Sequence, residues 1–374
     1  MLVEVIIRGY PRSAIYELRE LSKSKGYEIA EEIFQRRNKP DPAYLIGKGK
    51  LYEIKRIVKE KNIRKIIFLN TLKASQAFRI RKEVGWGVDV IDRNILILEI
   101  FEERARTSEA KIQIELARLR YMLPWVKEYL RFRNIYGEQV GFGALGEYLH
   151  KIYEQRIMSK IRNLEKRLES IRSKGISIMV RRHEYNLPEV ILTGYTQAGK
   201  TELFNSLTKE RKTVGQGFFT TLSTCARKIE TGNGTKMILI DSIGFIENMH
   251  PIIINAFYAT LYELTISDII LLIVDASEKE EEIERKLRTM QDIINRIAPT
   301  TELLIVPNKI DLINEEKINI VIKIIRQFFP YNDIVCVSAK KKINLELLID
   351  KVVEKLRKNG KVKKEVTLPA FHSF

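Results

Sequence analysis

The feature that most restricts the fold of this chain is a glycine-bounded loop at residues 194–201. It reads Gly-Tyr-Thr-Gln-Ala-Gly-Lys-Thr and lies between the apolar run 190–192 and a helical stretch at 201–207. The pattern G-x-x-x-x-G-K-[ST] between a strand and a helix is typical of a phosphate-binding loop. An isolated match can also be an ordinary strand-to-helix turn. The partner motifs downstream favour the phosphate loop.

Each position of this loop has an expected role. Gly194 and Gly199 let the backbone curl so that amide groups and the following helix N-terminus face phosphate oxygens. Lys200 is expected to reach the β- and γ-phosphates, and the Thr201 hydroxyl is expected to be a ligand of Mg²⁺. The predicted nucleotide contacts here are Gly194, Tyr195, Thr196, Gln197, Ala198, Gly199, Lys200 and Thr201.

Two switch-like segments follow the loop in the expected order. A strand-like run at 236–240 ends in Asp241-Ser242-Ile243-Gly244, which places a carboxylate near the Mg²⁺ and a glycine near the γ-phosphate. Between the two motifs lies the segment 217–222, where Thr221, chosen over Thr220, is expected to cover a second Mg²⁺ position. The predicted catalytic residues are therefore Lys200, Thr221 and Gly244, and the predicted metal ligands are Thr201, Thr221 and Asp241.

A guanine-reading motif follows the buried runs 268–274 and 303–306. In Asn308-Lys309-Ile310-Asp311, the Asp311 carboxylate can accept from N1–H and the N2 amino group of guanine, which adenine does not offer. We expect Asn308 to bond the N7 side of the purine and the Lys309 stem to lie over the base. Backbone amides of Ser338, Ala339 and Lys340 are expected near guanine O6. The ordered set predicts a domain that binds and hydrolyses GTP with Mg²⁺.

The fold class predicted for the chain is α/β. Residues 1–93 alternate apolar runs with helical stretches, which favours a small α/β layer with a largely parallel sheet. Residues 94–182 carry apolar side chains at three- and four-residue intervals, which predicts a long antiparallel helical hairpin that Pro124 can interrupt. Residues 183–357 form the predicted GTPase domain, a mostly parallel sheet with flanking helices. Residues 358–374 are a short basic tail.

The net charge of +17 is concentrated in the first half of the chain. Residues 1–187 contain 39 Lys and Arg against 24 Asp and Glu, a net +15, whereas residues 188–374 contain 26 against 24, a net +2. A polyanionic partner bound through phosphate contacts is one interpretation. A solvated basic surface of a thermophile protein is the other. The predicted hairpin carries much of the charge: Arg118, Arg120, Lys127, Arg131, Arg133, Lys151, Arg156, Lys160, Arg162, Lys166 and Arg167. Unpaired RNA bases could stack on the interleaved aromatic residues Tyr121, Trp125, Tyr129, Phe132 and Tyr136. The alternative is that some of them close the end of the helix pair, which is at least equally expected for Trp125 and Phe132.

The remaining composition indicates a cytoplasmic protein. The two cysteines, Cys225 and Cys336, lie far apart and lack metal-ligand spacing, which is typical of a reducing compartment. No apolar run approaches the ~20 residues that span a bilayer, and the N-terminus lacks the apolar core of a signal peptide. The four histidines form no cluster in the sequence. We expect a monomer.

The motifs together resemble one family, the HflX family of translational GTPases. The resemblance rests on Gly-Tyr-Thr at 194–196, Phe-Thr-Thr-Leu at 219–222 and Asp-Ser-Ile-Gly-Phe-Ile at 241–246, and on N-terminal segments such as Gly-Lys-Gly-Lys at 47–50 and Gln-Ile-Glu-Leu-Ala at 113–117. It covers roughly residues 40–355. It implies association with the large ribosomal subunit and its rRNA, and a stress-related role in splitting or rescuing ribosomes.

Two residues depart from common GTPase patterns. Phe245 stands where many GTPases have a glutamine that orients the attacking water, so slow intrinsic hydrolysis is expected. Packing of Phe245 in the core is an alternative reading of the same residue. Gln197 stands where the family usually has asparagine, which puts stimulation by a monovalent cation in question.

Two other functions fit parts of the sequence. The chain could be a GTP-dependent scaffold whose hairpin binds a protein partner. Alternatively, the segment Gly47-Lys48-Gly49-Lys50 could belong to a second, ATP-binding site, although it lacks a complete phosphate-loop pattern.

Overall fold

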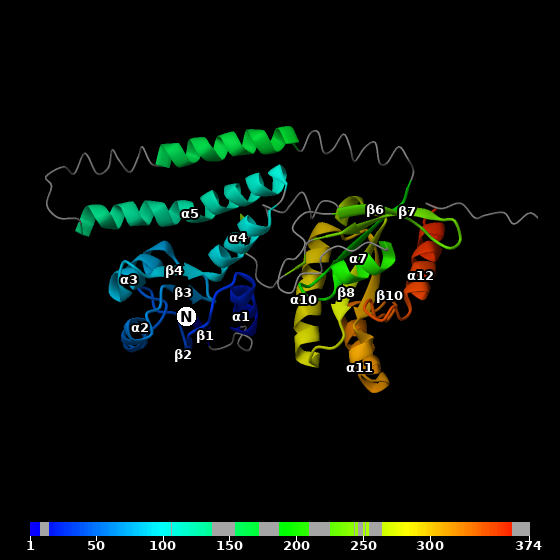
Figure 1. The fold of residues 1–374 in the computed structure, drawn as a ribbon, viewed down its shortest axis with the longest axis horizontal. Coiled ribbons are helices and arrows are strands. Elements are labelled where there is room, and N and C mark those ends of the chain that lie inside the picture. Colours follow the sequence, from blue (N-terminus) through cyan, green and yellow to red (C-terminus); the bar gives the residue numbers. More distant parts are fainter. Residues whose placement is uncertain are drawn as a thin grey trace, which may run out of the picture. The chain divides into compact units, whose positions relative to one another are not determined.

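The chain folds into two compact units. The structure is a computed structural model that describes residues 1–7, 15–105, 107–136, 154–171, 187–208, 225–242, 244–245, 250, 252–253 and 264–360 (Figure 1). The N-terminal unit comprises residues 1–174 with the short segments 216–219 and 249–257, and the second unit comprises residues 175–215, 220–248 and 258–374.

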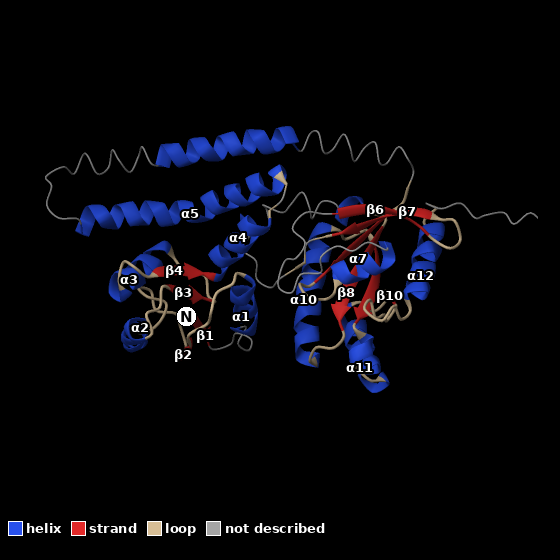
Figure 2. Ribbon diagram, viewed as in Figure 1, coloured by secondary structure: helices blue, strands red, loops and turns tan. Residues whose placement is uncertain are grey.

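A four-stranded parallel sheet forms the centre of the N-terminal unit (Figure 2). The strands are β1 (Leu2–Ile7), β2 (Glu32–Arg37), β3 (Lys65–Phe68) and β4 (Asp89–Asp92), in the order β2-β1-β3-β4. The crossover helices are α1 (Ile15–Ser24), α2 (Lys48–Glu60) and α3 (Ala74–Val84), and α4 (Arg93–Arg104) follows β4. Parallel pairing of this kind needs helical crossovers. The predicted small α/β layer is confirmed.

Side chains alternate between the two faces of each strand, and the apolar ones on one face form a core of the N-terminal unit. Val3 and Phe68 on the sheet pack in one apolar cluster with Ile54 of α2 and Ile80 of α3. Between α1 and α4 lies a buried ion pair, in which Arg93 Nε donates to Glu17 Oε1 over 3.0 Å. A buried pair of this kind ties the two helices together in a fixed geometry because either charge alone would be costly there.

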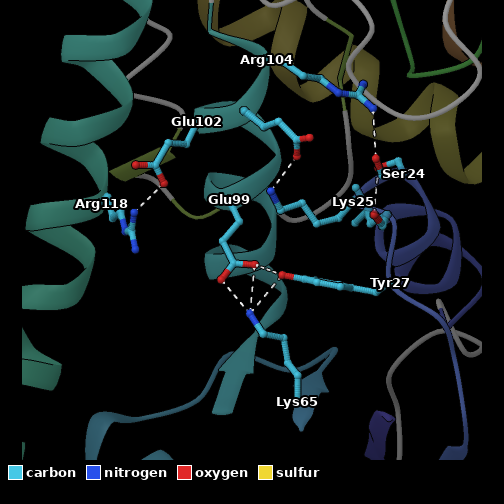
Figure 3. A network of polar contacts seen from close by, with 10 residues as sticks. Ser24, Lys25, Tyr27, Lys65, Glu99, Glu102, Arg104 and Arg118 are labelled. Carbon is cyan, nitrogen blue, oxygen red and sulfur yellow. Dashed lines mark hydrogen bonds and ion pairs between the residues drawn. The ribbon is translucent and has the colours of Figure 1, made fainter.

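A polar network fixes α4 against β3 and the end of α1 (Figure 3). The Lys65 amine donates to Glu99 Oε1 over 3.0 Å and to the Tyr27 hydroxyl over 3.1 Å, and that hydroxyl donates to Glu99 Oε2 over 2.9 Å. Burial disfavours the charged amine, but the hydrogen bonds that Lys65 donates to Glu99 and Tyr27 prevail and raise the pKa of Lys65. Lys25 extends the network by an ion pair with Glu103 at 2.6 Å.

Two long helices lie side by side in the same unit. They are α5 (Ser108–Tyr136) and the helix at 154–171, which share a cluster containing Leu116, Leu164 and Leu168. Pro124 lies inside α5, so the expectation that it interrupts the helix is wrong. Proline removes one backbone hydrogen bond, and neighbouring packing outweighs that loss here.

The first half of α5 packs on the sheet layer. Tyr121 is buried, and its hydroxyl donates to Asp92 Oδ2 over 2.6 Å. Asp92 also caps α4 by accepting from the Ile95 amide over 3.1 Å. Burial raises the pKa of the Asp92 carboxyl, and the hydrogen bond from Tyr121 opposes that shift. The His250 ring lies edge-on to Tyr121 with ring centroids 5.0 Å apart, within the same compact unit.

The second unit contains a six-stranded sheet in the order β10-β9-β8-β5-β7-β6. The strands are β5 (Glu189–Gly194), β6 (Cys225–Glu230), β7 (Lys236–Asp241), β8 (Ile269–Asp275), β9 (Glu302–Asn308) and β10 (Asp333–Ile334). All pairs are parallel except β6 with β7. The helices are α7 (Lys200–Thr208), α10 (Glu280–Ile297), the short 3-10 helix η1 (Ile310–Leu312), α11 (Glu315–Phe328) and α12 (Leu345–Lys358). The predicted α/β class with a mostly parallel sheet is confirmed.

Helices cover both faces of this sheet. Ile191 and Leu272 face α10 and α11, whereas Val190 and Leu192 face α7 and α12. Strands buried on both faces are the continuous apolar runs seen in the sequence. In the described part of the chain, no helix is long and apolar enough to cross a membrane.

Candidate nucleotide-binding site

The predicted site residues converge at the carboxyl ends of the parallel strands. Gly194 ends β5, Asp241 ends β7, Asp275 ends β8 and Asn308 ends β9. Crevices at the carboxyl ends of such strands are the usual ligand sites of open α/β sheets. Within the described residues, no three or more His, Cys, Asp or Glu side chains lie together so that they could hold a metal ion.

The two loop glycines are required by their surroundings. Gly194 has φ +145°, and a Cβ there would lie 2.3 Å from the Ile273 carbonyl oxygen. Gly199 has φ +89°, and its Cβ would lie 2.3 Å from Asn308 Nδ2. A side chain at either position would therefore collide with a neighbour in a backbone conformation that already disfavours L-residues. The loop is held close to β8 and to the Asn308 side chain.

Lys200 is buried at the start of α7, and its amine donates to the carbonyl oxygens of Gly194 over 3.2 Å and Tyr195 over 2.8 Å. Burial lowers the pKa of Lys200, the nearby Asp241 charge opposes that shift and the Lys286 charge adds to it, so that the pKa is about 8. The Lys200 amine thus contacts carbonyl oxygens of its own loop. Phosphate oxygens could replace these acceptors, as the sequence predicts.

Thr201 and Asp241 meet at the metal end of the site. The Thr201 hydroxyl donates to Asp241 Oδ2 over 3.2 Å, and both residues are buried. A hydroxyl and a carboxylate at this spacing are hard oxygen donors of the kind Mg²⁺ prefers. The pair therefore fits the metal that P-loop GTPases use with their nucleotide. Thr221, the other predicted ligand, lies outside the described residues.

The second switch is attached to the loop by its backbone. The Phe245 amide donates to the Gly194 carbonyl and the Thr196 amide donates to the Phe245 carbonyl, each over 2.9 Å. A Cβ on Gly244 would lie 2.7 Å from Lys200 Nζ, so the glycine permits this close approach. The Phe245 side chain is only 4% exposed and packs in a cluster with Tyr195. The core-packing alternative for Phe245 therefore fits the structure.

Asn308 joins three loops at the base end of the site. Its Nδ2 donates to the Ala198 carbonyl over 2.9 Å, and its Oδ1 accepts from the Ala339 amide over 3.0 Å. The residue is buried with 1% exposure. The phosphate loop, the Asn308–Asp311 motif and the Ser338–Lys340 segment thus share one buried amide, which fits the predicted role of tying the loops together.

Asp311 and Lys309 flank this amide. The Ser338 hydroxyl donates to Asp311 Oδ1 over 2.6 Å, which fixes the carboxylate that is predicted to read guanine. Lys309 has φ +68° and its amine pairs with Asp275 Oδ2 at 2.5 Å. Asp275 was missed by sequence reasoning. The available signal was an acidic residue that ends a buried strand, directly opposite Asn308 in the β8–β9 register.

Lys286 of α10 was also missed. Its amine lies 4.6 Å from the centre of the Tyr195 ring and donates to Glu278. A cation over an aromatic face is a stabilising contact. Because α10 has a plain amphipathic pattern, nothing in the sequence marked this lysine.

Gln197 and the Gly47–Lys50 segment have simple geometric accounts. Gln197 is exposed with φ +68°, a conformation that asparagine adopts more readily than glutamine. Gly47 precedes α2, its amide donates to Gln35 Oε1 over 2.8 Å, and a Cβ there would lie 2.4 Å from Arg37 Nη1. The amide contact gives Gly47 a structural role at the start of α2, whereas the end of the Arg37 side chain is flexible and can move aside for a Cβ.

Comparisons with known proteins cover nearly the whole chain. Residues 12–102 match a family described as "GTP-binding GTPase N-terminal", residues 104–182 match "GTP-binding GTPase Middle Region" and residues 189–309 match "50S ribosome-binding GTPase". These three matches follow one another along both compact units.

Relatives and a solved structure agree with the family matches. The chain is 40% identical to GTPase HflX of Thermofilum pendens over 91% of this chain and 79% of that protein, and 38% identical to GTPase HflX of Methanocaldococcus jannaschii over 93% and 84%. GTPase HflX of Escherichia coli is 32% identical over 80% and 70%. The crystal structure of SsGBP with GDP aligns with a TM-score of 0.52 at 29% identity, over 96% of this chain and 99% of that one.

Identity above 30% over most of both chains decides the assignment, and the resemblance inferred from the motifs is confirmed. Asn308 ends β9, Asp311 lies in η1 directly after it, and Lys200 begins α7. The chain belongs to the HflX family of GTPases, which bind and hydrolyse GTP.

Proposed function

We propose that this GTPase is a cytoplasmic, monomeric switch that binds the large ribosomal subunit through rRNA contacts of its N-terminal unit and splits or rescues stalled ribosomes under stress. The observation that carries the proposal is the charge distribution. The net charge is +15 in residues 1–187 and +2 in residues 188–374. A basic surface separate from the nucleotide site suits a large polyanion.

The ion pairs of the long helices show which charges are already neutralised. Arg120 of α5 pairs with Glu165 at 2.5 Å, Lys127 pairs with Glu154 at 2.6 Å, and Lys160 pairs with Glu115 at 2.6 Å. Arg118 pairs with Glu102 of α4. These four cations were expected to face RNA. Their acidic neighbours reduce the local positive field, so they contribute less to phosphate binding than the sequence suggested.

The outward face of the helix at 154–171 keeps its charge. Arg156, Arg162, Lys166 and Arg167 are exposed, and none has a hydrogen-bond or ion-pair partner among the residues that the structure describes. They lie opposite the apolar stripe that contains Leu164 and Leu168. Unpaired cations on an exposed helix face release condensed counterions when they meet phosphates. We assign the main rRNA contact to this face.

Two of the aromatic residues pack within the N-terminal unit. Tyr121 is buried with its hydroxyl on Asp92, and Trp125 packs against the apolar core of the sheet layer. Burial leaves Tyr121 no free face for a base, so the stacking role suggested for it is wrong. The partly buried Trp125 fits a packing role, because α5 lies against the sheet layer. The side chains of Tyr129, Phe132 and Tyr136 lie outside the described residues.

In this proposal, the bound nucleotide controls the two switch segments through residues at the phosphate end and at the base end of the site. We propose that Lys200 binds the phosphates, that Asp311 and Asn308 select guanine, and that Thr201 and Asp241 hold Mg²⁺, which neutralises phosphate charge. Gly244 and Thr221 report the γ-phosphate. Intrinsic hydrolysis is slow because the buried Phe245 cannot orient water, so the ribosomal partner completes the catalytic arrangement.

The salt dependence of binding tests the assigned surface. The triple variant Arg162→Gln, Lys166→Gln, Arg167→Gln removes three unpaired charges. Each lost phosphate contact reduces the slope of log K against log salt by about 0.7 to 0.9, so we expect a total reduction of about 2 to 3 for the three charges. Co-sedimentation with isolated large subunits in the GTP-bound state, across a salt series, measures it.

A matched triple supplies the control. Arg118→Gln, Arg120→Gln, Lys127→Gln removes the same net charge from ion-paired positions, so the slope is expected to fall by less than about 1. Equal slopes for the two triples would contradict the assigned face. If the wild-type protein neither sediments with large subunits nor gains GTPase activity from them, the ribosomal proposal fails and a protein-binding scaffold takes its place. Sedimentation of whole ribosomes after incubation with GTP tests splitting directly.

A further inference from the structure

The phosphate loop contains a buried hydroxyl with no partner. Thr196 is 4% exposed, and its Oγ1 has no hydrogen-bond partner among the residues that the structure describes. Folded proteins pair nearly all buried polar groups, because an unpaired one has lost its water without compensation. A hydroxyl of this kind inside a ligand-binding loop points to a partner that arrives with the ligand.

Thr196 lies where the phosphate loop and the second switch meet. Its amide donates to the Phe245 carbonyl over 2.9 Å. A Cβ built on Gly244 would lie 3.0 Å from both Cα and Cγ2 of Thr196, and 2.7 Å from Lys200 Nζ. The loop lysine and the switch glycine are the groups that flank a γ-phosphate in P-loop enzymes. A γ-phosphate bound between Lys200 and Gly244 would therefore lie next to the Thr196 side chain.

The usual water-orienting side chain is missing at this place. Phe245 follows the switch glycine, and its ring is packed in the apolar cluster with Tyr195. It has no group that can donate or accept a hydrogen bond. The side chain of Thr196 has both capacities, because a hydroxyl is one donor and two acceptor sites.

We propose that the Thr196 hydroxyl is a catalytic residue for GTP hydrolysis that contacts the γ-phosphate and its attacking water. The methyl group Cγ2 now faces Gly244, and a rotation of about 120° about χ1 brings the hydroxyl to the position that the methyl group occupies. The oxygen then accepts from the water and donates to a γ-phosphate oxygen. This places the hydroxyl in the role that glutamine has in other GTPases.

The step leaves threonine unchanged. The water oxygen forms a bond to the γ-phosphorus while the bond from phosphorus to the β–γ bridging oxygen breaks. The electron pair of that bond leaves with GDP, and a water proton passes to the inorganic phosphate. Thr196 holds the water in line throughout, so its contribution appears in the rate of hydrolysis and not in the affinity for GDP.

Single-turnover hydrolysis by the full-length protein tests this assignment. Thr196→Val keeps the shape and removes the hydroxyl, and we expect hydrolysis to slow by about five- to tenfold. Affinity for a fluorescent GDP should stay within about twofold of wild type. Thr196→Ser, which keeps the hydroxyl, should hydrolyse GTP within about threefold of wild type.

Thr193 provides a matched control in the same strand–loop unit. It is fully buried in β5, and its Oγ1 also has no hydrogen-bond partner among the described residues, but it lies before the loop. Thr193→Val should leave hydrolysis unchanged. Wild-type hydrolysis by Thr196→Val would overturn the proposal. So would an equal loss of rate in Thr193→Val, or a parallel loss of GDP affinity in Thr196→Val, since either would indicate a packing role. The outcome does not depend on ribosome binding, because the assay contains no ribosomes.

Discussion

Replacing Asn308 by alanine should separate the arrangement of the nucleotide site from the stability of the fold. The buried amide is the one side chain in the described site that bonds both the phosphate loop, through Ala198, and the Ala339 segment. Asn308→Ala removes both bonds at once and leaves a carbonyl and an amide N–H without partners in a water-poor place.

The size of the expected effect on GDP affinity can be worked out from these two unpaired backbone groups. Leaving a buried backbone donor or acceptor unpaired costs about 1 to 3 kcal/mol each. The three-loop arrangement therefore loses about 2 to 6 kcal/mol relative to states in which the loops separate and meet water. Apparent affinity falls with the population of the competent state, so even the lower bound predicts a GDP affinity about thirtyfold weaker.

Asn314→Ala is the matched control for this measurement. Asn314 caps α11 in the same unit, where its side chain accepts from the Lys317 amide over 3.0 Å. Loss of that cap costs about 1 kcal/mol of folding stability but touches no nucleotide group. Titration with fluorescent GDP, together with urea unfolding of each variant, separates the two effects.

The two variants should differ in kind. Asn314→Ala should bind GDP within about twofold of wild type while unfolding at lower urea. If Asn308→Ala binds GDP within threefold of wild type, the shared amide does not organise the site, and the reasoning from Ala198 and Ala339 is refuted.

Three further results are expected. GDP affinity should be full below pH 8 and fall above pH 8 by up to tenfold per pH unit. The reason is that the pKa of Lys200 without nucleotide is lowered to about 8, mainly by burial, and phosphate favours the charged amine. GDP titrations from pH 7 to 9.5 measure this dependence, and an affinity that does not change with pH would exclude it. Glu17→Gln should cost about 3 kcal/mol of N-terminal unit stability, because the buried Arg93 loses the Glu17 charge, and urea unfolding that matches wild type would argue against it. Gly199→Ala should abolish measurable nucleotide binding, since its Cβ would lie 2.3 Å from Asn308 Nδ2 at φ +89°, and retained binding in a GDP titration would show that the loop relaxes.

The strands and motifs of the second unit could be predicted well, because each is marked by residues that are neighbours in the sequence. Strands buried on both faces read as continuous apolar runs, and the motifs lie directly after them, so β5, β7, β8 and β9 could be placed with their functional ends. The strand β6 was missed. It is half exposed and pairs antiparallel with β7, so its residues carry neither a buried run nor a motif.

The site residues divide in the same way. Lys200, Asp241, Asn308 and Asp311 belong to patterns whose spacing is set by one turn or one loop. Lys286 reaches Tyr195 from a helix some ninety positions along the chain, so only packing brings them together.

The sequence alone determined the family, the nucleotide and the half of the chain that carries the net positive charge. The tertiary structure decided which charges remain available and which polar groups remain unpaired. Arg120 and Arg162 look alike in the sequence, but Arg120 of α5 pairs with Glu165 of the neighbouring helix, whereas Arg162 is exposed. Thr196 likewise looks like any loop threonine until Phe245 and Gly244 are folded against it. Charge pairing and hydrogen-bond satisfaction depend on distances between residues far apart in the chain, and folding sets those distances.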